Sequence, residues 1–412
     1  MLNGKKIFKD KKEVESFLFT LGLILFFTLI IVLGAWLVRF SGTADPNNSD
    51  LPASLRENIY RARVIAVEDE EIGGTHIQTL QIRITNRDLR GTEVSITKTI
   101  MGNAVALRNG NRIMVRLQPS AEGAEPVFFF NSYDRTLPLL FLFLFFILCV
   151  IILGRLKGIR AIIALSLTFA TIFFILVPML LRGWNPILLG IITCIFATLM
   201  TVSICFGVGK KSLSALIGIS GGLLIGGIIA YLFGLFTRIA GIGHGDAHYL
   251  LWLPNAYRLD FRGLLFAGII IGALGACQDV AISVSSSMTE LKTNNSNIGR
   301  KELINSGFNI GRDIMGSMVN TLVLAYTGGA LASIMVFVGF GRGFSEIINM
   351  EFIATEIVRA IAGSLGLLFA IPLTIFAFVL LDSKIKKNKQ STPLKSNQPV
   401  DDTAINQDDK NV

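Results

Sequence analysis

Residues 262–291 read RGLLFAGIIIGALGACQDVAISVSSSMTEL, and residues 311–329 read GRDIMGSMVNTLVLAYTGG. Both stretches are largely apolar, and each reaches the length of about 20 residues that a membrane-spanning helix needs. The first carries an acid, Asp279, in its inner half, and Arg312 and Asp313 stand at the start of the second. Ionisable groups at membrane depth are costly and by default indicate function. The two stretches therefore predict an integral membrane protein with a functional pathway.

The rest of the 412-residue chain is similarly apolar, with 52% hydrophobic and only 16% charged residues. Several further uninterrupted apolar runs reach membrane-spanning length. Lysines and arginines gather before the first run, after the last, and in alternate short loops, which is typical of cytoplasmic flanks. Both termini are therefore expected to be cytoplasmic. We expect eight helices, at about 17–38, 137–154, 161–181, 186–208, 212–236, 263–289, 313–339 and 357–381.

Several function classes receive no support from the sequence. The excess of Lys+Arg (38) over Asp+Glu (29) flanks the apolar runs and forms no basic soluble face, so no nucleic-acid partner is expected. We find no phosphate-binding glycine loop, nucleophile elbow or zinc-protease motif, so no enzyme activity and no cofactor are predicted. The four cysteines all fall within apolar runs and suggest neither a disulfide framework nor a zinc site.

A soluble segment separates the first two expected helices. Within it, apolar and polar residues alternate, as at Leu80–Thr85 and Arg112–Leu117, between glycine and asparagine breaks. This pattern predicts about five short strands, which would most easily close as a small barrel of the OB or SH3-like type. The expected parts of the chain are a basic cytoplasmic N-terminus (1–16), the first helix (17–38), an extracytoplasmic β-rich domain (39–136), a seven-helix membrane domain (137–381) and a disordered cytoplasmic tail (382–412).

Polar residues recur at helical spacing in both of the decisive stretches. If the two stripes face each other, they enclose acids, hydroxyls and an amide that could relay protons or coordinate a cation, because removal from water favours a protonated carboxyl. The alternative is that Asp279 is a structural group bonded to a neighbouring helix, and that the hydroxyls only pack. The expected pathway residues are Asp279, Ser283, Ser286 and Glu290 in the first stretch, and Arg312, Asp313, Ser317, Asn320 and Thr327 in the second.

Glycines and histidines provide two further patterns. Small residues four apart let helices approach closely, which predicts helix packing at Gly218, Gly222 and Gly226 and at Gly268, Gly272 and Gly275. His244, Asp246 and His248 are weak candidates for a metal site, because imidazole and carboxylate suit zinc or manganese. A fourth ligand is not evident, and a solvated glycine-rich loop is the favoured interpretation, so no metal is predicted.

The chain resembles the YibE/F family of bacterial membrane proteins. Three stretches carry the resemblance: LDFRGLLFAGIIIGALGACQDVAISVSSSMTEL (259–291), GFNIGRDIMGSMVNTLVLAYTGG (307–329) and EIVRAIAGSLGLLFAIPLT (356–374). The resemblance implies a multi-pass protein of the bacterial cytoplasmic membrane whose activity is unassigned. The layout of an acid-bearing helix, a basic loop and a helix that opens near an arginine is also similar to the central part of RND-type exporters and Sec export accessory subunits.

Two hypotheses follow from these patterns. In the first, the chain is a proton- or cation-coupled secondary transporter or export accessory protein in which Asp279 carries the ion. In the second, it is a non-transporting scaffold or sensor whose outer β domain binds a ligand or partner. The expected partners are the lipid bilayer and either further copies of the chain or a second family member; the sequence does not name a transported solute.

Overall fold

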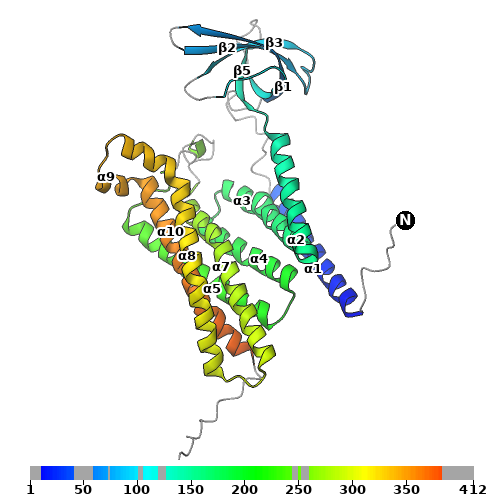
Figure 1. The fold of residues 1–412 in the computed structure, drawn as a ribbon, viewed down its shortest axis with the longest axis vertical. Coiled ribbons are helices and arrows are strands. Elements are labelled where there is room, and N and C mark those ends of the chain that lie inside the picture. Colours follow the sequence, from blue (N-terminus) through cyan, green and yellow to red (C-terminus); the bar gives the residue numbers. More distant parts are fainter. Residues whose placement is uncertain are drawn as a thin grey trace, which may run out of the picture.

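The computed structural model describes residues 11–40, 59–72, 75–100, 105–118, 127–243, 249–251 and 259–382. A β domain lies beyond one end of a body of long helices (Figure 1). The connection between α7 and α8 lies at the opposite end of that body (Figure 1). The tail after Asp382, and most of the basic N-terminus, lie outside the described residues.

Seven helices among the described residues are long and apolar enough to cross a membrane. Together with the family relationship given below, they indicate a membrane protein. The spanning run Thr136–Leu181 combines α2, η2 and α3, and the short α9 is not one of the seven. All helical segments of the described residues are α1 (Lys11–Phe40), α2 (Thr136–Thr171), the π-helical segment η2 (Ile172–Leu176), α3 (Val177–Leu181), α4 (Pro186–Phe206), α5 (Lys210–Phe236), α7 (Phe261–Asn294), α8 (Arg300–Gly339), α9 (Phe344–Asn349) and α10 (Glu351–Leu381).

One of the seven runs, Thr136–Leu181, contains two of the eight helices predicted from the sequence. Its backbone breaks at Arg155, where φ is 49° and ψ is −130°. A Cβ on Gly158 would lie 2.2 Å from the carbonyl oxygen of Val150, eight residues earlier. A continuous helix would separate these residues by about 12 Å, so the chain turns back on itself at Arg155.

Local sequence signals set the ends of α4 and α7. The Asn185 side chain accepts hydrogen bonds from two backbone N–H groups of the first turn of α4, and Pro186 occupies the first helical position. The helix ends at Gly207, whose positive φ of 76° is readily adopted by glycine. Asp260 caps α7 by accepting a hydrogen bond from the Gly263 N–H. These signals determine where α4 begins and ends and where α7 begins.

Helices α4, α5, α7, α8 and α10 enclose the main buried core. At its centre, α5 and α10 approach closely at Gly222, where an added Cβ would lie 2.5 Å from the backbone oxygen of Gly366. Helix α8 contributes the buried Leu303 to this core, and half-buried apolar side chains such as Phe308 and Met315 pack against it. Three of its four buried residues, Leu303, Gly307 and Gly311, lie in its first third, and the fourth, Ala330, lies further along. The remainder of α8 presents most of its surface outward.

The β domain is a single antiparallel sheet in the order β3-β2-β1-β4-β5, curved into a half-barrel. Five strands confirm the number predicted from the alternation. Their inward residues form a separate core that includes Leu80, Ile82 and Ile113. The strands are β1 (Ile59–Ile72), β2 (Thr75–Ile84), β3 (Glu93–Ile100), β4 (Arg112–Gln118) and β5 (Val127–Tyr133).

The predicted bounds differ from the observed ones by the most at the start of α8. The sequence predicted a helix starting at 313, whereas α8 starts at Arg300. Arg312 and Asp313 therefore lie inside a helix and not at its mouth. The reason is that residues 300–312 are too polar for a membrane-spanning run but still place Leu303, Gly307 and Gly311 on one buried face.

Candidate functional site

The polar stripe of α7 lies on the side of the helix that faces away from the core. Asp279 and Ser283 are exposed, whereas Cys277 and Val280 beside them are fully buried. Ser286 is half-buried and Glu290 is exposed, so the stripe continues to the end of the helix. Asp279 lies 18 residues from the first residue of α7, or about 27 Å along the axis. Within the described chain it has neither a hydrogen-bond partner nor an ion-pair partner.

The polar stripe of α8 is exposed as well. The structure places Arg312, Asp313, Ser317, Asn320 and Thr327 on surfaces that no described residue covers. The hydrogen bonds made by these side chains stay within α8: Arg312 donates to Asn309 and Thr327 donates to the Val323 carbonyl. The stripe is thus available to a group outside the described chain.

The two stripes do not form a hydrogen-bonded chain within the described residues. Helix α8 approaches the exposed side of α7 at Tyr326, whose hydroxyl would lie 3.1 Å from a Cβ on Gly272. The guanidinium of Arg359 on α10 lies 5.9 Å from the centre of the Tyr326 ring. Arg359 in turn donates a hydrogen bond to Glu356. These residues connect α7, α8 and α10 on the side of Asp279 that is nearer the start of α7.

The two predicted sets of packing glycines behave differently. An added Cβ on Gly218, Gly222 or Gly226 would come within 3.0 Å of α10, so these glycines allow α5 and α10 to approach. Around Gly268 and Gly275, by contrast, nothing lies within 4 Å of an added Cβ. The second set therefore has no packing partner in the described chain apart from the Tyr326 hydroxyl. It continues the exposed stripe that contains Asp279.

An ionic cluster with a buried acid joins the start of α5, the last turn of α7 and the end of α10. The Asp382 carboxylate lies 3.2 Å from the Lys210 ammonium and 3.8 Å from that of Lys292. Asp382 is only 8% exposed. Nearby, the Ser214 and Ser285 hydroxyls lie 2.9 Å apart. Sequence reasoning missed this cluster, since its members are 80 or more residues apart in the chain.

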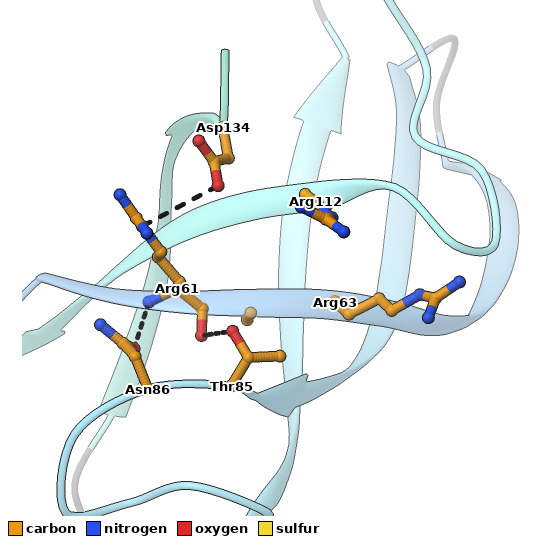
Figure 2. A pocket seen from close by; sticks show the side chains of 7 residues that line it. Arg61, Arg63, Thr85, Asn86, Arg112 and Asp134 are labelled. Atoms are coloured by element: carbon orange, nitrogen blue, oxygen red, sulfur yellow. Dashed lines mark hydrogen bonds and ion pairs between the residues drawn. The ribbon is translucent and has the colours of Figure 1, made fainter. Parts of the chain in front are cut away.

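An arginine-lined cavity lies on the outer face of the β domain (Figure 2). Its volume is about 340 Å³. Asp134 interacts with Arg61 at 3.9 Å, and the Arg61 backbone N–H donates to the Asn86 side chain. The hydrogen bond between Asp134 and Thr136 holds the pKa of that carboxyl below its usual value, and the Arg61 and Arg112 charges act in the same direction. The lining residues are Arg61, Ala62, Arg63, Thr85, Asn86, Arg112 and Asp134.

The weak metal candidates His244, Asp246 and His248 lie outside the described residues. Among the residues that are described, no group of three or more His, Cys, Asp or Glu side chains is arranged to hold a metal ion.

A family model for YibE/F-like proteins matches residues 142–384, more than half of the chain. The chain belongs to the YibE/F-like family. Comparisons with curated proteins and with solved structures returned no match. The region matched by the YibE/F-like model contains the α7 and α8 stripes and the Asp382 cluster. It does not include the β domain, so the arginine-lined cavity lies in a part of the chain that the family model does not describe.

Proposed function

We propose that this YibE/F-like protein is a subunit of a proton- or cation-coupled transporter or export accessory complex, and that Asp279 carries the coupling ion. The observation behind the proposal is an acid midway along an apolar helix, exposed on a face where the described residues give it no polar partner. An aspartate facing lipid at the centre of a bilayer costs about 3 kcal/mol. A functional partner, either protein or water, would offset that cost.

A second copy of the chain is the partner proposed for this face. Gly268 and Gly275, where no described residue lies within 4 Å of an added Cβ, are about two helical turns apart on this face, and small residues on one face let two helices approach closely in a bilayer. In a symmetric pair each residue lies at the depth of its counterpart. Asp279 of one copy would then lie near the Asp279 and Ser283 of the other, and two nearby carboxyls share a proton readily.

The proposed orientation follows from charge. The connection between α7 and α8 lies at the end of the helical body opposite the β domain (Figure 1). Lys292 is in the last turn of α7, and Lys210 at the start of α5 shares its partner Asp382, as expected for a cytoplasmic side. The β domain would then be extracytoplasmic, both termini cytoplasmic, and the membrane the bacterial plasma membrane. The strand order is compatible with a partly open five-stranded barrel of the OB type.

Proton flux into proteoliposomes tests the role of Asp279. The full chain is reconstituted with an internal pH-sensitive dye, and a potassium gradient with valinomycin imposes a membrane potential. We expect internal acidification faster than in empty vesicles, loss of that difference in Asp279→Asn, and its retention in Glu302→Gln. Glu302 is the matched control because it is an exposed acid in the first turn of α8, outside both stripes. Equal flux in Asp279→Asn and the parent protein would exclude the coupling role.

Cross-linking tests the proposed pairing separately. In a chain whose native cysteines are replaced, we expect Ser283→Cys to form a disulfide between copies in the membrane. Ile228→Cys on α5 is the control, because Ile228 is 57% exposed but lies on another helix. Equal cross-linking at the two positions would indicate random collision and contradict the proposed pairing.

The second candidate function is a non-transporting scaffold or sensor whose β domain binds a ligand. The arginine-lined cavity favours it, since such a cavity does not contribute to an ion path through the helices. A chain with no Asp279-dependent flux but with a ligand in this cavity would support this second function.

A further inference from the structure

Three arginines stand side by side on neighbouring strands of the β domain. Arg63 on β1 is directly opposite Arg83 on β2 and directly opposite Arg112 on β4. Directly opposite residues project from the same face of a sheet, and like charges in such pairs are destabilising. The inward face cannot accept them, because the alternate residues Ala62, Val64 and Ile113 form the domain core. The repulsion therefore has to be relieved on the outer face.

The acids of the domain relieve only part of this repulsion. Glu93 forms an ion pair with Arg83, and Asp134 lies 3.9 Å from Arg61. Neither Arg63 nor Arg112 has a carboxylate within 4 Å among the described residues. Both arginines line the same cavity, so its lining includes two arginines without an acid of their own.

The cavity has the size and the polar groups for a small anion. Its lining contains three arginines and a single carboxylate, a formal excess of two positive charges. Figure 2 shows the arginine side chains spread along β1 and β4, with Asp134 at the Arg61 end. Thr85 and Asn86 fix the backbone of Arg61 by hydrogen bonds to its carbonyl oxygen and its N–H. Planar guanidinium groups match the geometry of phosphate oxygens through paired hydrogen bonds.

The position of the cavity suggests where such a phosphate comes from. Asp134, at one end of the cavity, accepts a hydrogen bond from the backbone N–H of Thr136. Thr136 is the first residue of α2, which opens an apolar run long enough to span a membrane. The start of a spanning helix lies at the level of the lipid headgroups. The cavity is thus held close to the plane where phospholipid phosphates are concentrated.

We propose that the cavity formed by Arg61, Arg63 and Arg112 binds a phosphate group. This group belongs either to a phospholipid headgroup or to free phosphate, and the competition experiment below distinguishes the two. The ligand neutralises the opposed Arg63 and Arg112 and ties the β domain to the membrane surface at the start of α2. This role is independent of Asp279 and of the transport proposal.

Binding to the full chain in detergent tests the proposal. The probes are dioctanoylphosphatidylglycerol and inorganic phosphate, and bound lipid is measured by native mass spectrometry as a function of concentration. We expect Arg63→Gln and Arg112→Gln each to weaken lipid binding about tenfold, the loss expected for one charge-assisted contact. Arg116→Gln is the matched control, because it removes the same charge from the same face of β4 outside the cavity. We expect it to bind as the parent does.

The melting temperature provides a second readout, in which the ligand-free variant should not be weakened although its lipid binding is. Arg63→Gln removes a like-charge contact, so we expect the ligand-free variant to melt no lower than the parent while losing the stabilisation caused by the anion. A misfolded Arg63→Gln variant would be recognised by a lower melting temperature than that of the parent. In that case, Arg112→Gln would be compared with the parent in the same way, with and without the anion.

Competition distinguishes the two sources. If excess inorganic phosphate displaces the lipid, free phosphate occupies the cavity; if it does not, the headgroup in its lipid setting is the ligand. Either result supports a phosphate site. The proposal is overturned if neither probe binds saturably, or if Arg116→Gln weakens binding as much as Arg63→Gln.

Discussion

Adding a single methyl group at Gly222 should separate the two helices at the centre of the body. A Cβ at this position would lie 2.5 Å from the backbone oxygen of Gly366 and 2.7 Å from the Cβ of Ala370, both on α10. Ordinary contacts between such atoms are about 3.5–4.0 Å. Gly222→Ala therefore requires α5 and α10 to move apart by about 1 Å, since the oxygen it meets belongs to the backbone of a helix and cannot rotate away.

The expected cost follows from two opposing effects. Overpacking of a close interface costs about 1–3 kcal/mol. Replacing a helical glycine with alanine stabilises the helix by about 0.5–1 kcal/mol, because alanine loses less backbone entropy on folding. The net loss is about 1 kcal/mol, which corresponds to a fall of roughly 2–4 °C in melting temperature for a domain of this size.

Melting of the purified full chain in detergent, followed by the loss of the monodisperse size-exclusion peak, measures this effect. Gly22→Ala is the control: Gly22 is also a helical glycine in an apolar run, but nothing lies within 4 Å of an added Cβ. We expect the control to melt at or slightly above the parent temperature. Gly222→Ala combined with Ala370→Gly should recover part of the loss. If Gly222→Ala melts at the same temperature as Gly22→Ala, the close approach of α5 and α10 does not contribute to the stability of the helical body.

Two further predictions concern buried carboxylates. Asp382→Ala leaves Lys210 and Lys292 without their shared partner, so we expect the free energy of unfolding to fall by about 2 kcal/mol. The loss is smaller than for a fully buried pair because Lys210 is 50% exposed. Unfolding in denaturant measures the change, and a loss below about 0.5 kcal/mol would contradict the role of the cluster. Asp134, whose pKa is lowered by its hydrogen bond with Thr136, stabilises the folded state above its unfolded pKa and loses that contribution as pH falls through the folded value. The melting difference between the parent and Asp134→Ala should be greatest above about pH 5 and disappear in stronger acid; a difference that persists there would exclude the ionic contribution.

The membrane helices could be predicted from the sequence because their apolar runs are long and uninterrupted. The start of α8 could not be predicted in this way, because hydropathy identifies only the part of a helix that suits lipid. Residues 300–312 include charges on the exposed side and Leu303, Gly307 and Gly311 on the buried side. Their four-residue spacing is a helical signal that an amphipathic reading would have found.

The candidate surfaces were predictable to different extents. Helical spacing placed Asp279, Ser283 and Ser286 on one face, but spacing does not say which neighbour that face meets. In the β domain, the alternation at Arg112–Leu117 placed Arg112 on the face opposite its apolar neighbours, but no predicted alternation included Arg63. Their opposition across two strands depends on the register of pairing, which the alternation alone does not determine. The arginine-lined cavity therefore emerged only from the three-dimensional arrangement.

The two faces of α7 impose different constraints on the same helix. Toward the core, Cys277, Val280 and Val284 are fully buried, so volume changes there would disturb packing with the neighbouring helices. On the opposite face, nothing in the described chain lies within 4 Å of a Cβ added at Gly268, and Asp279 is exposed without a hydrogen-bond or ion-pair partner there. A helix that served only to hold the fold would carry apolar side chains on that outer face, because lipid tolerates them without cost. An acidic residue there is costly in lipid, and small residues there let a partner helix approach closely. Assembly and ion coupling are therefore proposed for the same surface.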